Sequence, residues 1–455
     1  MSPNFSKHRL IKSLAVLAAL LAIVAVALPW KFWLEKRLIT MFEAQGFQNV
    51  HLTVSALGVR GISLKDISVG SNTRLTLEDI TIGYSLPELW RGDLRELNIK
   101  GLTLQAYHAP DQWTIDGLDN WLNSSNGKAN ASIPVTFDQL SSIPLVGAKL
   151  ENSNLHITSN QWQIDIPLQL AWQKLPVPKL TYQAKALTFK MHDLDISTGE
   201  TSLESILHED DKKWYGEWRM KDILVQGGAV PIPVMEGKGS LTAHAEDISL
   251  LGEFKSADNS YKANFSMEYD LNSSEKSLFT LREAIIPWNS GTLSVHNVRM
   301  PLAGKNPTEF NLKVQRVSVD ALMQMLTGKR ASATGTVSGN IPVTIGTDGG
   351  ITFHQGSLRA EQPGTIIMAP DAIPGDNEQI VLVRDILKNL HYNMLFIAVN
   401  SDKGNKLSVL LTLQGNNPDV YEGRPVKLNV HLTGDMLSLI QQSIMPFMNP
   451  QQLLQ

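Results

Sequence analysis

The sequence predicts a mainly β chain that begins with a transmembrane helix and contains only a few short helices. Three observations carry this prediction. An uncharged apolar run occupies residues 13–30, and short alternating apolar and polar segments recur along most of the chain beyond it. Of the 455 residues, 43% are hydrophobic and 18% are charged, so the chain can bury a large apolar surface.

Composition already excludes several classes of protein. Forty-four acidic and forty basic residues leave a net charge of −4, which argues against a general electrostatic nucleic-acid binder. The chain has no cysteine, which removes disulfides, thiolate catalysis and iron–sulfur clusters. We therefore expect no nucleic acid among the partners.

The run Ser13–Trp30 is eighteen residues long, about the length that spans a bilayer. Basic residues precede it, which predicts a cytoplasmic N-terminus and export of the chain beyond residue 45, to the periplasm in a bacterium. A cleaved signal peptide with a site at Ala25–Ala27 is the alternative. The residues expected to anchor the chain in the membrane are Leu14, Leu17, Leu20, Ile23 and Val26.

The segment after the anchor has helical periodicity. Leu34, Leu38, Met41 and Phe42 are expected to share one face of this helix, and Gly46 is expected to end it.

Strands account for most of the remaining chain. In Lys406–Gln414, residues Leu407, Val409, Leu411 and Leu413 alternate with mostly polar neighbours, the pattern of a sheet with one apolar face. Other runs of this kind are Arg74–Tyr84, Arg95–Ala106 with a phase slip at Gly101 that suggests a bend, Thr292–Val298, Thr308–Val314 and Arg424–Thr433.

Helices are few. We expect them at Val319–Thr327, Glu378–Leu390 and Asp435–Met445, and a loop or linker at Asn123–Ser132. So many short strands fit sandwiches, a propeller or a solenoid, and the loose recurrence of apolar–Gly–apolar segments favours one long curved sheet.

Catalytic motifs are missing from the sequence. It contains no HExxH, GxSxG, P-loop or GxGxxG pattern, so we expect neither an enzyme nor a cofactor. The charged cluster His208–Lys213 could hold a metal but is more typical of a solvated loop, and Asp193 with Asp195 lacks a third ligand. Asn417–Pro418–Asp419 reads as a turn between hairpin strands.

The residues also resemble a known family. GVRGISLKDISVG and RLTLEDITIGYSLPELWRGDLRELNIKGLTLQA, within residues 58–106, resemble the opening of the AsmA-like superfamily of inner-membrane-anchored periplasmic proteins. Five further segments occur in an order similar to the YdbH-like C-terminal domain, once labelled a dicarboxylate transport domain: Ile285–Leu293, Val317–Leu326, Ala333–Pro342, Gly350–Gly364 and Leu407–Leu432.

The resemblance implies a bridge-like lipid-transfer protein with an elongated, U-shaped β groove that moves phospholipids between inner and outer membranes. It also implies a small outer-membrane lipoprotein that adds strands at the C-terminal edge. Alternation alone is more typical of an ordinary core, and a structural scaffold or assembly factor of the cell envelope is the alternative function. The groove residues expected are Leu75, Leu77, Leu102, Leu104, Leu407, Val409, Leu411, Leu413, Val426, Leu428 and Val430.

The sequence thus predicts a chain of three parts. Residues 1–45 hold the cytoplasmic tail, the anchor and its helical extension. Residues 46–280 form the N-terminal part of the periplasmic groove, and residues 281–455 form the YdbH-like β region with a terminal amphipathic helix.

Overall fold

A computed structural model gives the fold. It describes residues 30–58, 60–71, 75–85, 87, 90, 94–109, 112–118, 145–160, 162–191, 194–227, 232–271, 273, 276–302, 306–327, 329–346, 350–372, 378–401 and 407–433. The predicted anchor residues, the loop Asn123–Ser132 and the helix Asp435–Met445 lie outside these ranges.

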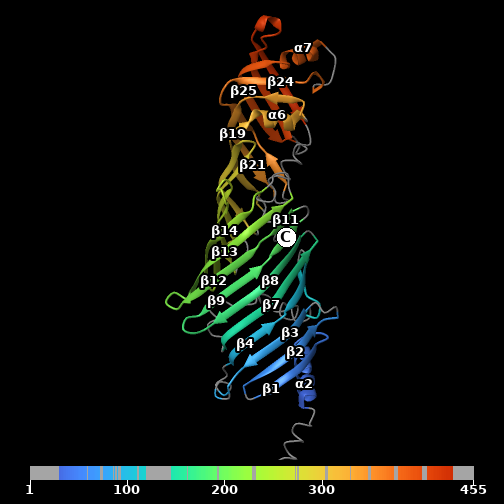
Figure 1. The fold of residues 1–455 in the computed structure, drawn as a ribbon, viewed down its shortest axis with the longest axis vertical. Coiled ribbons are helices and arrows are strands. Elements are labelled where there is room, and N and C mark those ends of the chain that lie inside the picture. Colours follow the sequence, from blue (N-terminus) through green and yellow to red (C-terminus); the bar gives the residue numbers. More distant parts are fainter. Residues whose placement is uncertain are drawn as a thin grey trace, which may run out of the picture. The chain divides into compact units, whose positions relative to one another are not determined.

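The chain divides into two compact units, which are described separately. Unit 1 comprises Met1–Pro134, Pro144–Thr158 and Leu168–Lys174. Unit 2 comprises Val135–Ile143, Ser159–Pro167 and Leu175–Gln455. Strands dominate the described residues of both units, as the alternating pattern predicts (Figure 1).

Unit 1 is a mixed sheet with one helix. Strands β1 to β4 pair in order as an antiparallel meander, and β4 then pairs with β7 in parallel. Its elements are α2 (Trp30–Ala44), β1 (His51–Gly58), β2 (Gly61–Val69), β3 (Leu75–Gly83), β4 (Leu94–Lys100), β5 (Thr103–Ala109), β6 (Gln112–Thr114), β7 (Leu145–Ser159) and residues 168–173 of β8 (Trp162–Gln173).

The bend expected at Gly101 is present. Gly101 lies between β4 and β5 with φ at +65°, and a Cβ there would stand 2.3 Å from Cγ of Glu78. Glycine is the residue that adopts this conformation without strain, so the phase slip in the sequence marks a real break between strands.

Helix α2 confirms the predicted helix after residue 30, but the prediction that Met41 shares a face with Leu34, Leu38 and Phe42 is wrong. Leu34, Leu38 and Phe42 pack on the sheet, whereas Met41 is 49% exposed and lies on the other side. The helix ends at Ala44, and Gly46 follows with φ at +102°. Among the described residues, no helix combines the length and apolar character needed to cross a membrane.

Unit 2 is built mainly from one antiparallel ladder. From β9 it runs through β12, β13, β14, β15, β16, β17, β18, β19, β21, β23, β25 and β26 to β27. The first strands are β9 (Lys179–Lys185), β10 (Thr188–Met191), β11 (Leu194–Ser197), β12 (Glu200–His208), β13 (Lys213–Gln226), β14 (Met235–Ala243), β15 (Asp247–Ser256), β16 (Lys262–Asp270) and β17 (Leu278–Trp288).

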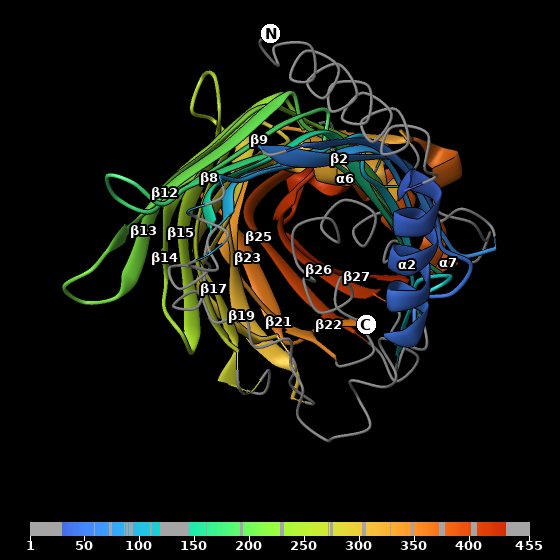
Figure 2. The same cartoon turned by 90° about the horizontal axis from the view of Figure 1, so that it is seen from below.

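Among the later strands, β18, β19, β26 and β27 agree closely with predicted runs. The later strands are β18 (Gly291–Pro301), β19 (Thr308–Ser318), β20 (Ala331–Ala333), β21 (Thr336–Ile345), β22 (Ile351–Phe353), β23 (Gly356–Ala360), β24 (Gly364–Met368), β25 (Leu390–Ser401), β26 (Leu407–Asn416) and β27 (Val426–Thr433). Figure 2 shows β19, β21, β23 and β25, which pair in this order, along a curved wall.

Two helices of unit 2 cover part of this wall. Helix α6 (Val319–Thr327) has the predicted bounds, whereas α7 (Glu378–Leu387) ends earlier than predicted because Leu390 already begins β25. The amide of Asn417 donates hydrogen bonds to the carbonyl oxygens of Asp385 and Ile386, at 2.9 and 3.1 Å, and so fixes the end of α7. Two short 3-10 turns, Pro370–Ala372 and Tyr421–Gly423, complete the unit.

Candidate functional site: an apolar sheet face

The strongest candidate for a functional surface is a set of apolar rows that run from strand to strand. One row in unit 2 passes through paired positions of seven strands, β12 to β18: Leu203, Trp218, Gly239, Gly252, Phe265, Leu281 and Val298. Residues paired across antiparallel strands point to the same face. A second row lies beside it: Met220, Gly237, Phe254, Ala263, Ala284 and Val295.

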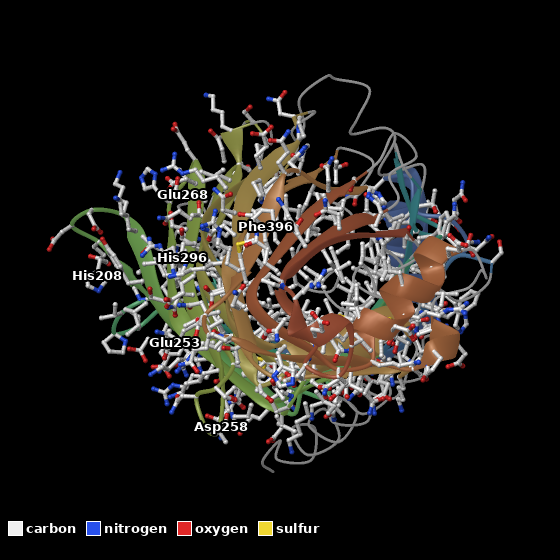
Figure 3. All side chains as sticks on the ribbon, turned by 90° about the horizontal axis from the view of Figure 1, so that it is seen from above. His208, Glu253, Asp258, Glu268, His296 and Phe396 are labelled. Carbon is white, nitrogen blue, oxygen red and sulfur yellow. The ribbon has the colours of Figure 1, made fainter. Side chains whose placement is uncertain are left out.

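The opposite face of the same strands is polar. Arg219, Lys238, Glu253, Asn264, Glu283 and His296 form one paired row there. Lys238 lies 3.2 Å from Glu253, and Glu283 contacts Lys262 at 3.4 Å and His296 at 3.5 Å. Glu253 and His296 are labelled in Figure 3, where all described side chains are drawn. The strands therefore separate an apolar face from a charged one.

An aromatic group marks the middle of the apolar face. The rings of Phe254 and Phe265 stack at 5.3 Å, and Phe279 stacks on Phe265 at 5.8 Å. The ring centroid of Trp218 lies 5.8 Å from that of Phe254 and 6.0 Å from that of Phe265. The indole N–H of Trp218 donates a hydrogen bond to the Leu251 carbonyl at 3.2 Å. Such offset ring contacts add to the stability given by burial.

Glycines make room for this aromatic group. A Cβ on Gly252 would lie 2.2 Å from the Trp218 ring, and one on Gly239 would lie 2.7 Å from it. The indole therefore lies flat over two glycines of its own row. Sequence analysis did not single out these residues. The available signal was the Trp214–Trp218 spacing, which places both rings on one face of a strand.

Burial of the apolar face differs along the ladder. Between β12 and β18, four apolar residues of this face are half-buried, namely Leu203, Leu250, Phe254 and Phe279, whereas their row neighbours Trp218, Phe265, Leu281 and Val298 are buried. Toward β25 and β26 the rows close into a core, where Leu395, Leu411 and Leu413 are each 2% exposed. Met323 from α6, together with Ile386 and Leu387 from α7, belongs to that core.

The C-terminal groove candidates lie on this face in register. Leu411 stands opposite Val430, Leu413 opposite Leu428, and Val426 opposite Gly415. Val409, Leu411 and Leu413 on β26 are buried, whereas the candidates on β27 are half-buried: Val426, Leu428 and Val430. The backbone of Leu407 pairs with Ser401. Thus at β26 the predicted face is present but covered, and it is not open to solvent.

The N-terminal groove candidates lie in unit 1 and are half-buried. Leu75 stands opposite Leu104, and Leu77 stands opposite Ile67. The backbone N–H of Leu102 donates to Oγ of Ser153 at 3.1 Å. The same sheet carries a continuous apolar row from β1 to β7: Val54, Leu64, Ile80, Ile99 and Leu150.

Burial falls along that row with distance from α2. Val54 is 1% exposed and Leu64 is 7% exposed beneath the helix, whereas Ile80, Ile99 and Leu150 are half-buried. Beyond the helix, the apolar side chains of unit 1 are therefore covered incompletely. A strand face of this kind is stable only against another apolar layer.

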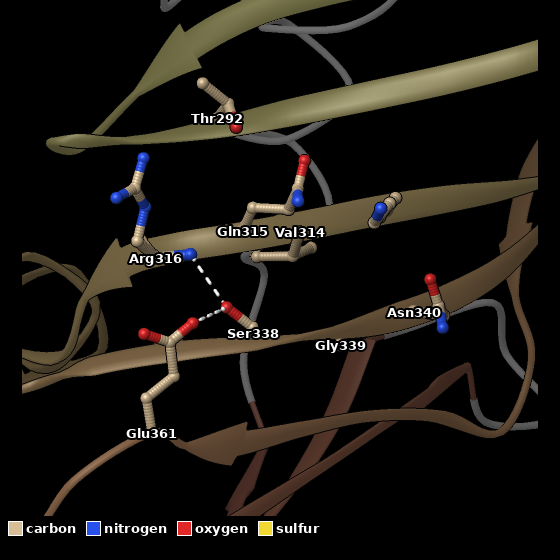
Figure 4. Close-up of a pocket in the computed structure, with 9 residues that line it drawn as sticks. Thr292, Val314, Gln315, Arg316, Ser338, Gly339, Asn340 and Glu361 are labelled. Atoms are coloured by element: carbon tan, nitrogen blue, oxygen red, sulfur yellow. Dashed lines mark hydrogen bonds between the residues drawn. The ribbon is translucent and has the colours of Figure 1, made fainter.

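A surface pocket in the C-terminal part of unit 2 is polar. Its lining includes Thr292, Gln315, Arg316, Ser338 and Glu361 (Figure 4). The backbone N–H of Arg316 donates to Oγ of Ser338 at 2.8 Å, and the Ser338 hydroxyl donates to the Glu361 carboxylate. These contacts hold a bulge where the pairing of β19 with β21 shifts between Val314 and Val317.

The charged cluster at residues 208–213 is a hairpin turn. The Asp211 carboxylate accepts hydrogen bonds from the Tyr215 hydroxyl at 2.7 Å and the Lys213 N–H at 3.2 Å, and the Tyr215 bond lowers the pKa of Asp211. Asp195 lies 3.5 Å from Lys190, and Asp193 lies outside the described residues. No group of three metal-ligating side chains occurs among the described residues.

These features define the class: a β protein in which antiparallel ladders present one apolar face over many strands, and in which the described helices cover only part of that face. Residues 258–454 match the model of the YdbH-like family, described as intermembrane phospholipid transport protein YdbH. This match confirms the family resemblance of the C-terminal part of the chain. Neither a curated protein nor a solved structure gives a significant match.

Proposed function

We propose that the protein transfers phospholipids between the inner and outer membranes of a bacterium, along the apolar face of its sheet. The observation that carries this proposal is the set of paired apolar rows in β3 to β5 and in β12 to β17, in which side chains such as Leu75, Leu104 and Phe254 are only half-buried. The YdbH-like match over residues 258–454 supports phospholipid as the cargo.

The physical chemistry of such a surface suits acyl chains. Each methylene removed from water gains about 0.8 kcal/mol, so a diacyl lipid gains from an apolar row that side chains leave partly uncovered. Similar apolar sites succeed one another at about 4.8 Å, the spacing of paired strands, so lipid can move along the face without a chemical step. This mechanism uses no cofactor and no catalytic group.

The remaining parts of the proposal concern location. Residues 13–30 would anchor the chain in the inner membrane as a single span, with the bulk of the chain in the periplasm. A small outer-membrane lipoprotein would extend the sheet by adding strands beyond β27, the last described strand.

Photo-crosslinking in cells tests the proposal. A benzoylphenylalanine at Phe279 replaces one aromatic ring by another on the apolar face, and the same residue at Thr280 places it on the opposite face of β17. We expect phospholipid adducts from position 279 and not from position 280. Absence of phospholipid adducts at position 279, and likewise at Phe254 and Ile99, would overturn the proposal.

A second candidate function is a scaffold or assembly factor of the cell envelope. The observation that favours it is the filled core at Leu395, Leu411 and Leu413, which leaves these side chains 2% exposed. A scaffold predicts protein adducts, in place of phospholipid adducts, at positions 279, 254 and 99 in the same experiment.

A further inference from the structure

Helix α2 has two faces, and the described residues of the chain cover only one of them. Toward the sheet, Leu34, Leu38, Ile39 and Phe42 pack against the core made by Leu52, Val54, Leu64 and Ile67. This contact is the ordinary packing of an amphipathic helix on a sheet. It fixes which way the helix is turned about its own axis.

Two polar contacts fix the helix further. The carboxylate of Glu35 accepts a hydrogen bond from the backbone N–H of Val54 at 2.8 Å. The ammonium of Lys31 donates one to the carbonyl oxygen of Ser55 at 3.1 Å. Both contacts join the helix to backbone groups of β1. The helix is therefore held to the sheet at its first turns.

The outward side of α2 exposes three large apolar side chains. Phe32 is 66% exposed, Trp33 is 68% exposed and Met41 is 49% exposed. The other exposed side chains on this helix include Lys36, Arg37 and Glu43. Two adjacent aromatic rings that the sheet leaves exposed suit a second cover besides the sheet.

The sequence next to α2 indicates what covers its exposed face. The uncharged run of residues 13–30 ends at Trp30, the first residue of α2. Aromatic rings next to cationic side chains are the combination that settles at the boundary between headgroups and acyl chains. Lys36 and Arg37 would face the anionic lipid phosphates.

We propose that the outward face of α2 docks on the surface of a phospholipid bilayer and lies along it. This contact would fix β1, the first strand of the apolar row, beside the membrane. The inference rests on the membrane anchor of the proposed function, and it does not depend on lipid transfer.

A depth measurement separates a helix that lies on the bilayer from one that stands away from it. Thr40 follows Trp33 by seven residues, so it lies on the same face about 10 Å further along the axis. If α2 extended straight out of the membrane, Thr40 would reach into water. If α2 lies flat, Thr40 stays at the depth of Trp33.

The chain offers a direct probe because it has no cysteine. Single substitutions Ala27→Cys, Thr40→Cys and Leu175→Cys are made in the full chain, labelled with the fluorophore NBD and reconstituted in vesicles of phosphatidylcholine and phosphatidylglycerol. Ala27 reports the anchor. Leu175, which is 68% exposed in unit 2, is the control in water. Vesicles with nitroxide-labelled lipid then quench any fluorophore that touches the bilayer.

We expect the label at Thr40 to show blue-shifted emission and lipid quenching close to that at Ala27, and the label at Leu175 to show neither. Adding Phe32→Ser and Trp33→Ser should return Thr40 to the behaviour of Leu175. If nitroxide-labelled lipid does not quench the label at Thr40, the inference is overturned. This holds also when energy transfer between labelled copies shows that a second copy of the chain covers this face of α2. Quenching at Ala27 decides the anchor separately, and a lipid-transfer assay decides the transport function.

Discussion

Two stretches of the unit 2 ladder carry the same alternation but bury it differently. Between β12 and β17 the apolar face mixes buried residues, such as Trp218 and Phe265, with half-buried ones, such as Phe254 and Phe279. Between β19 and β26 their counterparts form a filled core, with Ile397 at 4% and Leu411 at 2% exposure. Side chains of α6 and α7 enter the second stretch, and the buried residues of both stretches belong to one cluster. Alternation therefore sets which way side chains face, and the cover decides whether they are buried.

The largest loss of stability is expected for a truncation in the filled core between β19 and β26. Leu411→Ala should destabilise this part of unit 2 by about 2–5 kcal/mol, because the surrounding side chains collapse only partly into the space. Leu410→Ala on the opposite face of β26, where the leucine is half-buried, is the matched control. Hydrogen exchange of the β25 and β26 amides measures both, and equal losses would show that the core is not filled there.

A smaller effect is expected from overpacking the aromatic group. Gly252→Ala places a Cβ 2.2 Å from the Trp218 ring and 2.7 Å from Phe265, which should cost about 1–3 kcal/mol. Gly58→Ala is the control, since a Cβ there meets nothing within 4 Å. The readouts are urea unfolding and Trp218 fluorescence. A neutral Gly252→Ala would mean that the indole moves aside freely.

The half-buried stretch should respond less than the core to truncation. Phe279→Ala should cost about 1.5 kcal/mol or less, because the ring gives up only part of its surface to the protein. Its effect should grow when phospholipid is present, since the ring then has a second partner. Urea unfolding with and without short-chain phospholipid measures this. A loss as large as that of Leu411→Ala would place both stretches in the same kind of core.

The sequence predicted the strands well because alternation and glycine breaks are local signals. β3, β18, β19 and β26 coincide with the runs that alternation marked, and Gly101 ends β4 as its phase slip indicated. Local signals also placed α6. They failed at Met41, because periodicity in a short helix does not show which of two adjacent apolar residues will face the sheet. They also failed at Leu390, because an apolar residue fits the end of α7 and the start of β25 equally well.

The site was less predictable for a related reason. Leu411 and Phe279 have the same alternation in sequence, and their burial differs because it depends on neighbours from other strands and helices, which the local pattern does not show. The family resemblance pointed to the apolar face as a groove, and no local pattern could tell which part of that face is filled. Trp218 and its glycines were missed because their contact joins three strands.

The smallest expected effect concerns the hairpin between β15 and β16. The Asp258 carboxylate accepts hydrogen bonds from the hydroxyl groups of Ser256 and Ser260 and from the Ser260 N–H, and these bonds lower its pKa from 3.8 to about 2. A carboxyl whose folded pKa is lowered stabilises the fold above pH 3.8, and that contribution is lost as the pH falls to 2. NMR titration of the Asp258 carboxyl measures the pKa directly.

The same titration sharpens the comparison between the two stretches. Because Asp258 is fully exposed, its contribution is small and local, so acidification from about pH 4 to about pH 2 should increase hydrogen exchange at the tips of β15 and β16. The change should disappear in Asp258→Asn. Amides of β25 and β26 should show no difference between the two proteins. A difference that reached β25 would mean that both stretches open as one cooperative unit, in spite of their unequal cover.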